Sequence, residues 1–180
     1  MSKVALILSG CGYLDGAEIH ESTLSLLALA QAGHEVDSFA PDRDQFNVVN
    51  HITQEKMEEK RNILIESARI TRGKISPLSA LVVDDFDAIM LPGGYGVALS
   101  LSDFATKSTE CSVDPELKRI ILDFHSAKKP IGATCITPAI LAKIFEGVAS
   151  VRLTLGTVET YIWAMFPRSQ SWESLMPSIS

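Results

Sequence analysis

The sequence lacks the features that mark several large classes of protein. Its 180 residues include only three cysteines, an odd number without the spacing of a zinc ligand set, which argues against a disulfide framework and a metal site. The early apolar run, residues 4–8, is too short for a signal-peptide core or a membrane span. We therefore expect a cytoplasmic protein with reduced thiols, no metal and no membrane partner.

The charge pattern argues against binding of nucleic acid. Sixteen Lys and Arg stand against 22 Asp and Glu, a formal net charge of −6, and the basic residues between 56 and 72 are interspersed with glutamates. Phosphate contacts need clustered cations, so we expect no nucleic-acid partner. The apolar fraction of 46% is that of a globular chain of one domain.

Several catalytic motifs are also missing. The sequence has no Walker phosphate loop and no dinucleotide fingerprint opening the first helix, so no nucleotide cofactor is expected. All four histidines precede Cys135, whereas a glutaminase on this type of fold takes its histidine from farther along the chain. The usual base of an amidase or protease is therefore absent.

What is present is an alternation of strand and helix signals, which predicts an α/β fold with a mostly parallel sheet. The expected strands are residues 4–8, 35–40, 87–91 and 131–135, and the expected helices are residues 18–32, 54–70, 115–127 and 138–145. On the first helix we expect Leu24, Leu27 and Ala28 to face the core. Sites in such sheets lie where strands end, which directs attention to the loops after these strands.

Cys135 stands between an expected strand and an expected helix, the order of a nucleophile elbow. A helix N-terminus favours thiolate over thiol, so we expect Cys135 to be the most acidic and most reactive of the three cysteines. The alternative is a small buried hydrophobe. Gly93 and Gly94, after another buried strand, could let backbone amides approach an oxyanion, or could simply form a tight turn.

Four further residues are candidates near the same crevice. Glu18 and Glu21 begin the first helix, where acidic residues more often complement the helix dipole and face water. His20 is typical of a surface histidine. Cys11, after the first strand, is either a resolving thiol or an inert loop cysteine.

Taken together, six segments resemble one family, the ElbB glyoxalases of the PfpI superfamily, also described as isoprenoid biosynthesis proteins with an amidotransferase-like domain. The segments are residues 9–12, 15–21, 50–53, 68–73, 91–94 and 134–139. The resemblance covers a domain of residues 1–156, and residues 157–180 depart from the family pattern as a divergent or truncated tail.

The resemblance implies a flavodoxin-like three-layer sandwich of the class I glutamine amidotransferase type, usually a homodimer. It implies that Cys135 is the nucleophile and that Glu21 is a buried, protonated carboxyl touching it, with Gly93, Gly94 and Ile136 around the oxyanion. Glu18, His20 and Cys11 remain auxiliary candidates.

The leading functional hypothesis is a glyoxalase that needs neither glutathione nor a cofactor, a carbon–oxygen lyase that converts glyoxal, or a related small dicarbonyl, to the hydroxy acid glycolate. One alternative is a non-catalytic redox-sensing or regulatory protein linked to isoprenoid biosynthesis, in which Cys135 is oxidised. The other is a glutaminase-like subunit, against which the missing downstream histidine speaks.

Overall fold

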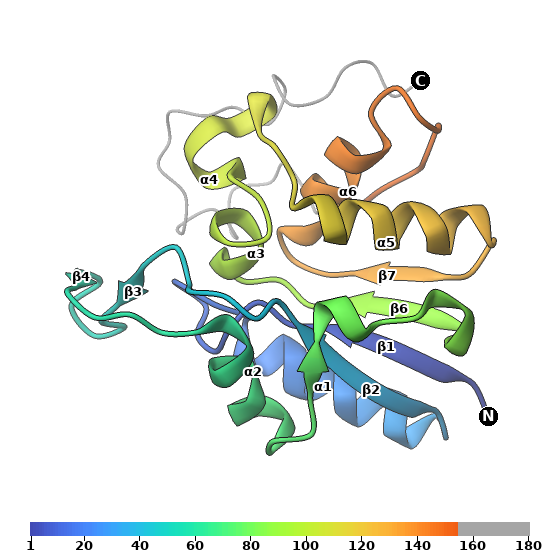
Figure 1. Cartoon of the computed structure of the whole chain (residues 1–180), viewed down its shortest axis with the longest axis horizontal. Coiled ribbons are helices and arrows are strands. Elements are labelled where there is room, and N and C mark those ends of the chain that lie inside the picture. The colour runs from blue at the N-terminus through green and yellow to red at the C-terminus, as the bar shows by residue number, and fades with distance from the viewer. Residues whose placement is uncertain (155–180) are drawn as a thin grey trace.

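The computed structural model describes residues 1–154, and they form a five-stranded parallel sheet between two layers of helices (Figure 1). The strand order is β5-β2-β1-β6-β7, and each neighbouring pair is parallel. The strands are β1 Lys3–Ile7, β2 Glu35–Ala40, β5 Ser76–Pro77, β6 Ala88–Leu91 and β7 Ile131–Ala133. The flavodoxin-like α/β prediction is confirmed. The expected boundary at residue 156 and the tail 157–180 lie outside the described residues.

Helices cover both faces of the sheet. One layer holds α1 Ile19–Gln31 and α2 Ile63–Thr71, and the other holds α3 Tyr95–Leu99, α4 Phe104–Lys107, α5 Pro115–Ser126 and α6 Thr137–Phe145 (Figure 1). The described residues also contain three short 3₁₀ helices, η1 Leu78–Ala80, η2 Val83–Asp85 and η3 Ser108–Glu110. Among residues 1–154, every helix is too short or too polar to cross a membrane.

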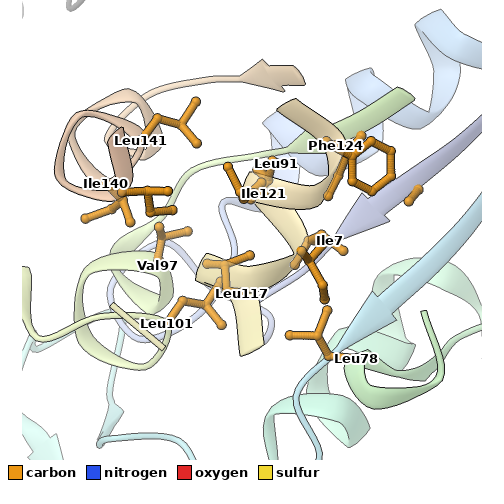
Figure 2. Packing of buried hydrophobic residues seen from close by; sticks show 14 of the residues in the cluster. Ile7, Leu78, Leu91, Val97, Leu101, Leu117, Ile121, Phe124, Ile140 and Leu141 are labelled. Carbon is orange, nitrogen blue, oxygen red and sulfur yellow. The ribbon is translucent and has the colours of Figure 1, made fainter. Parts of the chain in front are cut away.

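The central strand β1 is buried on both faces because alternate side chains point to opposite sides of a strand. Ala5 and Ile7 join the larger core under α3, α5 and α6, and Leu6 and Leu8 join a smaller core under α1 and α2. Figure 2 shows the larger core. Its labelled members are Ile7, Leu78, Leu91, Val97, Leu101, Leu117, Ile121, Phe124, Ile140 and Leu141.

Local signals set the bounds of α5 correctly. Asp114 caps the helix by accepting hydrogen bonds from the backbone N–H groups of Glu116 and Leu117, each at 2.9 Å, and Pro115 occupies the first turn. Leu117, Ile120, Ile121 and Phe124 then fall on the buried face.

Two predictions about helices are wrong. The charged stretch expected to open a helix at residue 54 instead contains an exposed strand, β4 Lys56–Met57, which pairs antiparallel with β3 Val48–Val49. The helix α2 begins only after Asn62, whose side chain accepts from the Ile65 N–H. On α1, Leu24 and Leu27 are 60% and 50% exposed. Leu26 faces the smaller core in their place.

Truncation of the larger core should destabilise the protein strongly. Phe124 is fully buried, so we expect Phe124→Ala to lower the free energy of unfolding by about 3–5 kcal/mol, measured by urea denaturation. The control is Arg119→Ala on the same helix, which removes only an exposed ion pair to Asp123. A loss near that of the control would show that the core around Phe124 is not close-packed.

Candidate active site

Cys135 lies on a sharp turn between β7 and α6. Its φ angle is +56°, in the left-handed region that residues other than glycine rarely occupy, so the turn must be held by its surroundings. The Thr137 hydroxyl donates to the Pro92 carbonyl at 3.1 Å, and the Thr134 N–H donates to the Leu91 carbonyl at 3.1 Å. These bonds fasten both sides of the elbow to the end of β6.

Gly93 is what lets β6 approach the thiol. A Cβ at this position would overlap the Cβ of Cys135 and lie 3.0 Å both from Cys135 Sγ and from Glu21 Oε2. Real Cβ atoms do not make such contacts with backbone-anchored neighbours, so any larger residue would push the elbow and the carboxylate apart. The glycine is therefore required by close approach.

Glu21 approaches the thiol from α1, which lies on the opposite face of the sheet from α6 (Figure 1). Its Oε2 accepts from the Gly93 N–H at 2.8 Å and from the Thr134 hydroxyl at 2.6 Å. The same carboxyl lies beside the Cys135 thiol and raises its pKa. The structure thus brings Cys135, Glu21 and Gly93 together from three separate elements.

The backbone amides of Gly94 and Ile136 complete the surroundings of the sulfur, where their N–H groups lower the pKa of the thiol. These two amides are among the groups that the family resemblance implied for binding an oxyanion, together with Gly93. Gly94 has a φ of +106° and stands directly before α3, and Ile136 stands directly before α6.

The pKa of the Cys135 thiol is raised, whereas the sequence led us to expect a lowered pKa. Burial of the sulfur raises the pKa of Cys135, the Glu21 carboxylate raises it further, and the N–H groups of Gly94 and Ile136 lower it without outweighing those effects. The expectation of a depressed pKa is wrong because it counted the helix N-terminus and left out the burial of the sulfur and the charge of the carboxylate beside it. Accessibility still favours Cys135: although neighbouring atoms partly desolvate its sulfur, the residue as a whole is exposed, whereas Cys11 is half-buried and Cys111 is buried.

The auxiliary candidates fall outside this group. Glu18 caps α1 by accepting from the Glu21 N–H at 2.7 Å, and its other oxygen pairs with the exposed ring of His20 at 3.0 Å. Burial raises the pKa of Cys11, and the charges next in effect are those of Glu66 and Arg69 on α2. The structure therefore places Cys11 and Cys135 in different electrostatic surroundings.

Three residues were missed by sequence reasoning. The Thr134 hydroxyl holds Glu21, and Tyr95 lies close enough to Cys135 and Tyr13 for both to raise the pKa of its phenol after burial. Thr134 and Tyr95 are sequence neighbours of Cys135 and Gly94, so adjacency was a usable signal for them. Tyr13 offered none.

The histidines and acidic residues also bear on what the site can do. Across residues 1–154, no group of three His, Cys, Asp or Glu side chains is arranged to hold a metal ion. In that same range the histidines have their contacts elsewhere. His20 contacts Glu18, His34 contacts the Ser2 N–H, His51 contacts Asp15 and His125 contacts Phe145.

Known proteins resemble this chain strongly. No family model matches it. It is 49% identical over 148 residues to the rat (Rattus norvegicus) "ES1 protein homolog, mitochondrial" and 48% identical over 148 residues to the human (Homo sapiens) "Glutamine amidotransferase-like class 1 domain-containing protein 3, mitochondrial". Each match covers 82% of this chain but only 56% and 55% of the relative, so the chain spans about half the length of these proteins.

These names correct one prediction. Both relatives are named mitochondrial, which contradicts the expected cytoplasmic location. The sequence argument looked for the apolar core of a secretory signal, whereas mitochondrial targeting uses amphipathic, Arg-rich segments that this argument does not detect.

A solved structure supplies the family. The isoprenoid biosynthesis protein with an amidotransferase-like domain from Ehrlichia chaffeensis superimposes with a TM-score of 0.78 at 41% identity. The match covers 82% of this chain and 70% of that one. With that identity and that shared fold over most of both chains, the chain belongs to the family of isoprenoid biosynthesis proteins with an amidotransferase-like domain.

Proposed function

We propose that the protein is a glyoxalase that works without glutathione or a cofactor, converting glyoxal or a related small dicarbonyl to the hydroxy acid. One observation carries the proposal: a single accessible sulfur contacts two backbone N–H donors and one carboxyl group. Those are the parts needed to add a thiol to an aldehyde, hold the resulting oxyanion and move protons. The mitochondrial names of the two relatives support the same compartment for this chain.

The first step is addition of the thiol to one aldehyde carbon. Because the pKa of Cys135 is raised, the starting thiol is protonated, and Glu21 takes its proton as the carbon–sulfur bond forms. The carbonyl oxygen becomes an alkoxide, and the N–H groups of Gly94 and Ile136 stabilise it once the sulfur has moved toward the carbon. Proton return gives a neutral hemithioacetal.

The second step moves hydrogen between the two carbons. Glu21 removes the proton from the carbon bonded to sulfur, giving an enediolate, and the protonated Glu21 then returns that proton to the neighbouring carbon. The first carbon is thereby oxidised to a thioester and the second is reduced to an alcohol, so no external oxidant or reductant is consumed. Water cleaves the thioester, which releases glycolate and restores the thiol.

The bonds to Glu21 suit this role. Its Oε2 is held by the Gly93 N–H and the Thr134 hydroxyl, so the carboxyl keeps a fixed position while it gives and takes a proton. A glutaminase would need a histidine base at the thiol, and the contacts of the four histidines within residues 1–154 speak against it. The homodimer stays a prediction.

Turnover of glyoxal tests the proposal directly. Cys135→Ser should be inactive, and Glu21→Gln, which keeps the hydrogen bonds but cannot exchange a proton, should lose about 10²-fold or more in kcat. The control is Cys111→Ala, which removes a buried thiol and should leave kcat unchanged. If the wild type shows no turnover above buffer while peroxide oxidises Cys135 selectively, the redox-sensing alternative replaces this one.

The pH dependence of thiol alkylation tests the partnership of Cys135 and Glu21. Since the Glu21 carboxylate raises the pKa of Cys135, Glu21→Gln should lower it and move the iodoacetamide rate profile of Cys135 to lower pH, with faster alkylation at neutral pH. Glu18→Gln is the matched control, because Glu18 caps the helix and leaves the thiol alone. An unshifted profile for Glu21→Gln would mean that Glu21 carries no charge in the free protein.

A further inference from the structure

The motif of residues 50–53 takes no part in the proposed chemistry, yet the structure joins it to Asp15, the first residue of the motif that ends at Glu21. Residues 15–21 contain Asp15, and residues 50–53 contain His51. Asp15 is only 3% exposed, and its Oδ2 accepts from the Val49 N–H at 2.8 Å. The side-chain amide of Gln45 donates to the Asp15 carbonyl at 3.1 Å. The hairpin segment is thus attached to the loop after β1 through Asp15.

The environment of Asp15 makes this attachment costly. Burial raises the pKa of Asp15, and a buried carboxylate is disfavoured unless nearby groups compensate it. The compensation comes first from the Val49 N–H and then from His51 and Arg61, while Glu66 acts against it. Because burying the Asp15 carboxylate is unfavourable, its presence here points to a role other than packing.

His51 supplies a second attachment. Its Nδ1 lies 3.0 Å from the Val49 carbonyl, which assigns the proton to Nδ1, so that Nε2 accepts from the Leu14 N–H at 3.4 Å. The ring meets the Tyr13 ring edge-on at 5.3 Å. A Cβ on Gly12 would lie 2.6 Å from His51 Nε2, so this loop packs directly on the imidazole.

The same loop holds the backbone beside the thiol. The Tyr13 carbonyl accepts from the Tyr95 N–H at 2.8 Å, and the Gly16 carbonyl accepts from the Gly96 N–H at 2.9 Å. These two amides immediately follow Gly94, the residue whose own N–H reaches Cys135. The position of the Gly94 donor therefore depends on the loop that Asp15 and His51 fix.

We propose that Asp15 is a positioning residue for Cys135. By accepting the Val49 N–H, it ties the hairpin to the loop whose carbonyls set the first turn of α3, and so places the Gly94 N–H against the reacting sulfur. The proposal rests on the proposed function in one respect, namely that Cys135 is the reacting thiol. Asp15 itself does not touch the sulfur and acts through the loop.

Three variants test this. Asp15→Ala removes the acceptor, so the Gly94 donor should drift from the sulfur, the Cys135 alkylation profile should move to higher pH, and kcat for glyoxal should fall about 10–100-fold with a smaller change in KM. Asp15→Asn keeps an acceptor for Val49 and should stay within about threefold of the wild type. Ile121→Val, a truncation in the α5 core, should lower Tm without shifting the profile.

The outcomes separate the two proposals. An Asp15→Ala variant that melts earlier but keeps the wild-type alkylation profile overturns the positioning role, as does an Asp15→Asn variant that behaves like Asp15→Ala. If Asp15→Ala does not fold, His51→Ala decides in its place, because it removes the Leu14 anchor from the hairpin side. Alkylation of Cys135 can be measured without turnover. If Asp15→Ala shifts the alkylation profile but the wild type does not convert glyoxal, the positioning role is supported and only the glyoxalase proposal is refuted.

Discussion

The approach of Gly93 to Cys135 is the contact on which the rest of the site depends. A left-handed turn at Cys135 points the thiol back toward the end of β6, and only the missing side chain of Gly93 leaves room for it. The same N–H of Gly93 binds Glu21, so one residue fixes the distance between the sulfur and the carboxyl. The sheet supplies this register, because β6 and β7 are parallel neighbours that end together.

Opposing electrostatic effects meet at the sulfur. Two backbone N–H groups favour the thiolate, while burial and the neighbouring carboxylate favour the thiol, and the second pair prevails. Such a balance suits a group that must hand its proton to a base at the moment of attack, because the thiol stays protected until a substrate is present. It suits a permanently reactive thiolate less well.

The surrounding loops are held by polar groups whose partners are far away in sequence. Glu18 caps α1 and presents Glu21, and Asp15 joins the loop after β1 to the hairpin at Val49. Buried polar bonds of this kind stabilise one arrangement because leaving either partner unpaired is costly.

The sequence by itself determined the elements whose signals are local. The apolar run of β1, the Asp114–Pro115 start of α5 and the strand–cysteine–helix order around Cys135 each depend on neighbouring residues, and the structure has all three. The buried face of α1 was not determined, because its leucines and alanines are spread around the helix and give no clear stripe. The tertiary structure decided that face. It also decided the contact of Glu21 with Thr134, which lies 113 residues away, and the raised pKa of Cys135, because both depend on which groups the folded sheet brings within a few ångströms of one another.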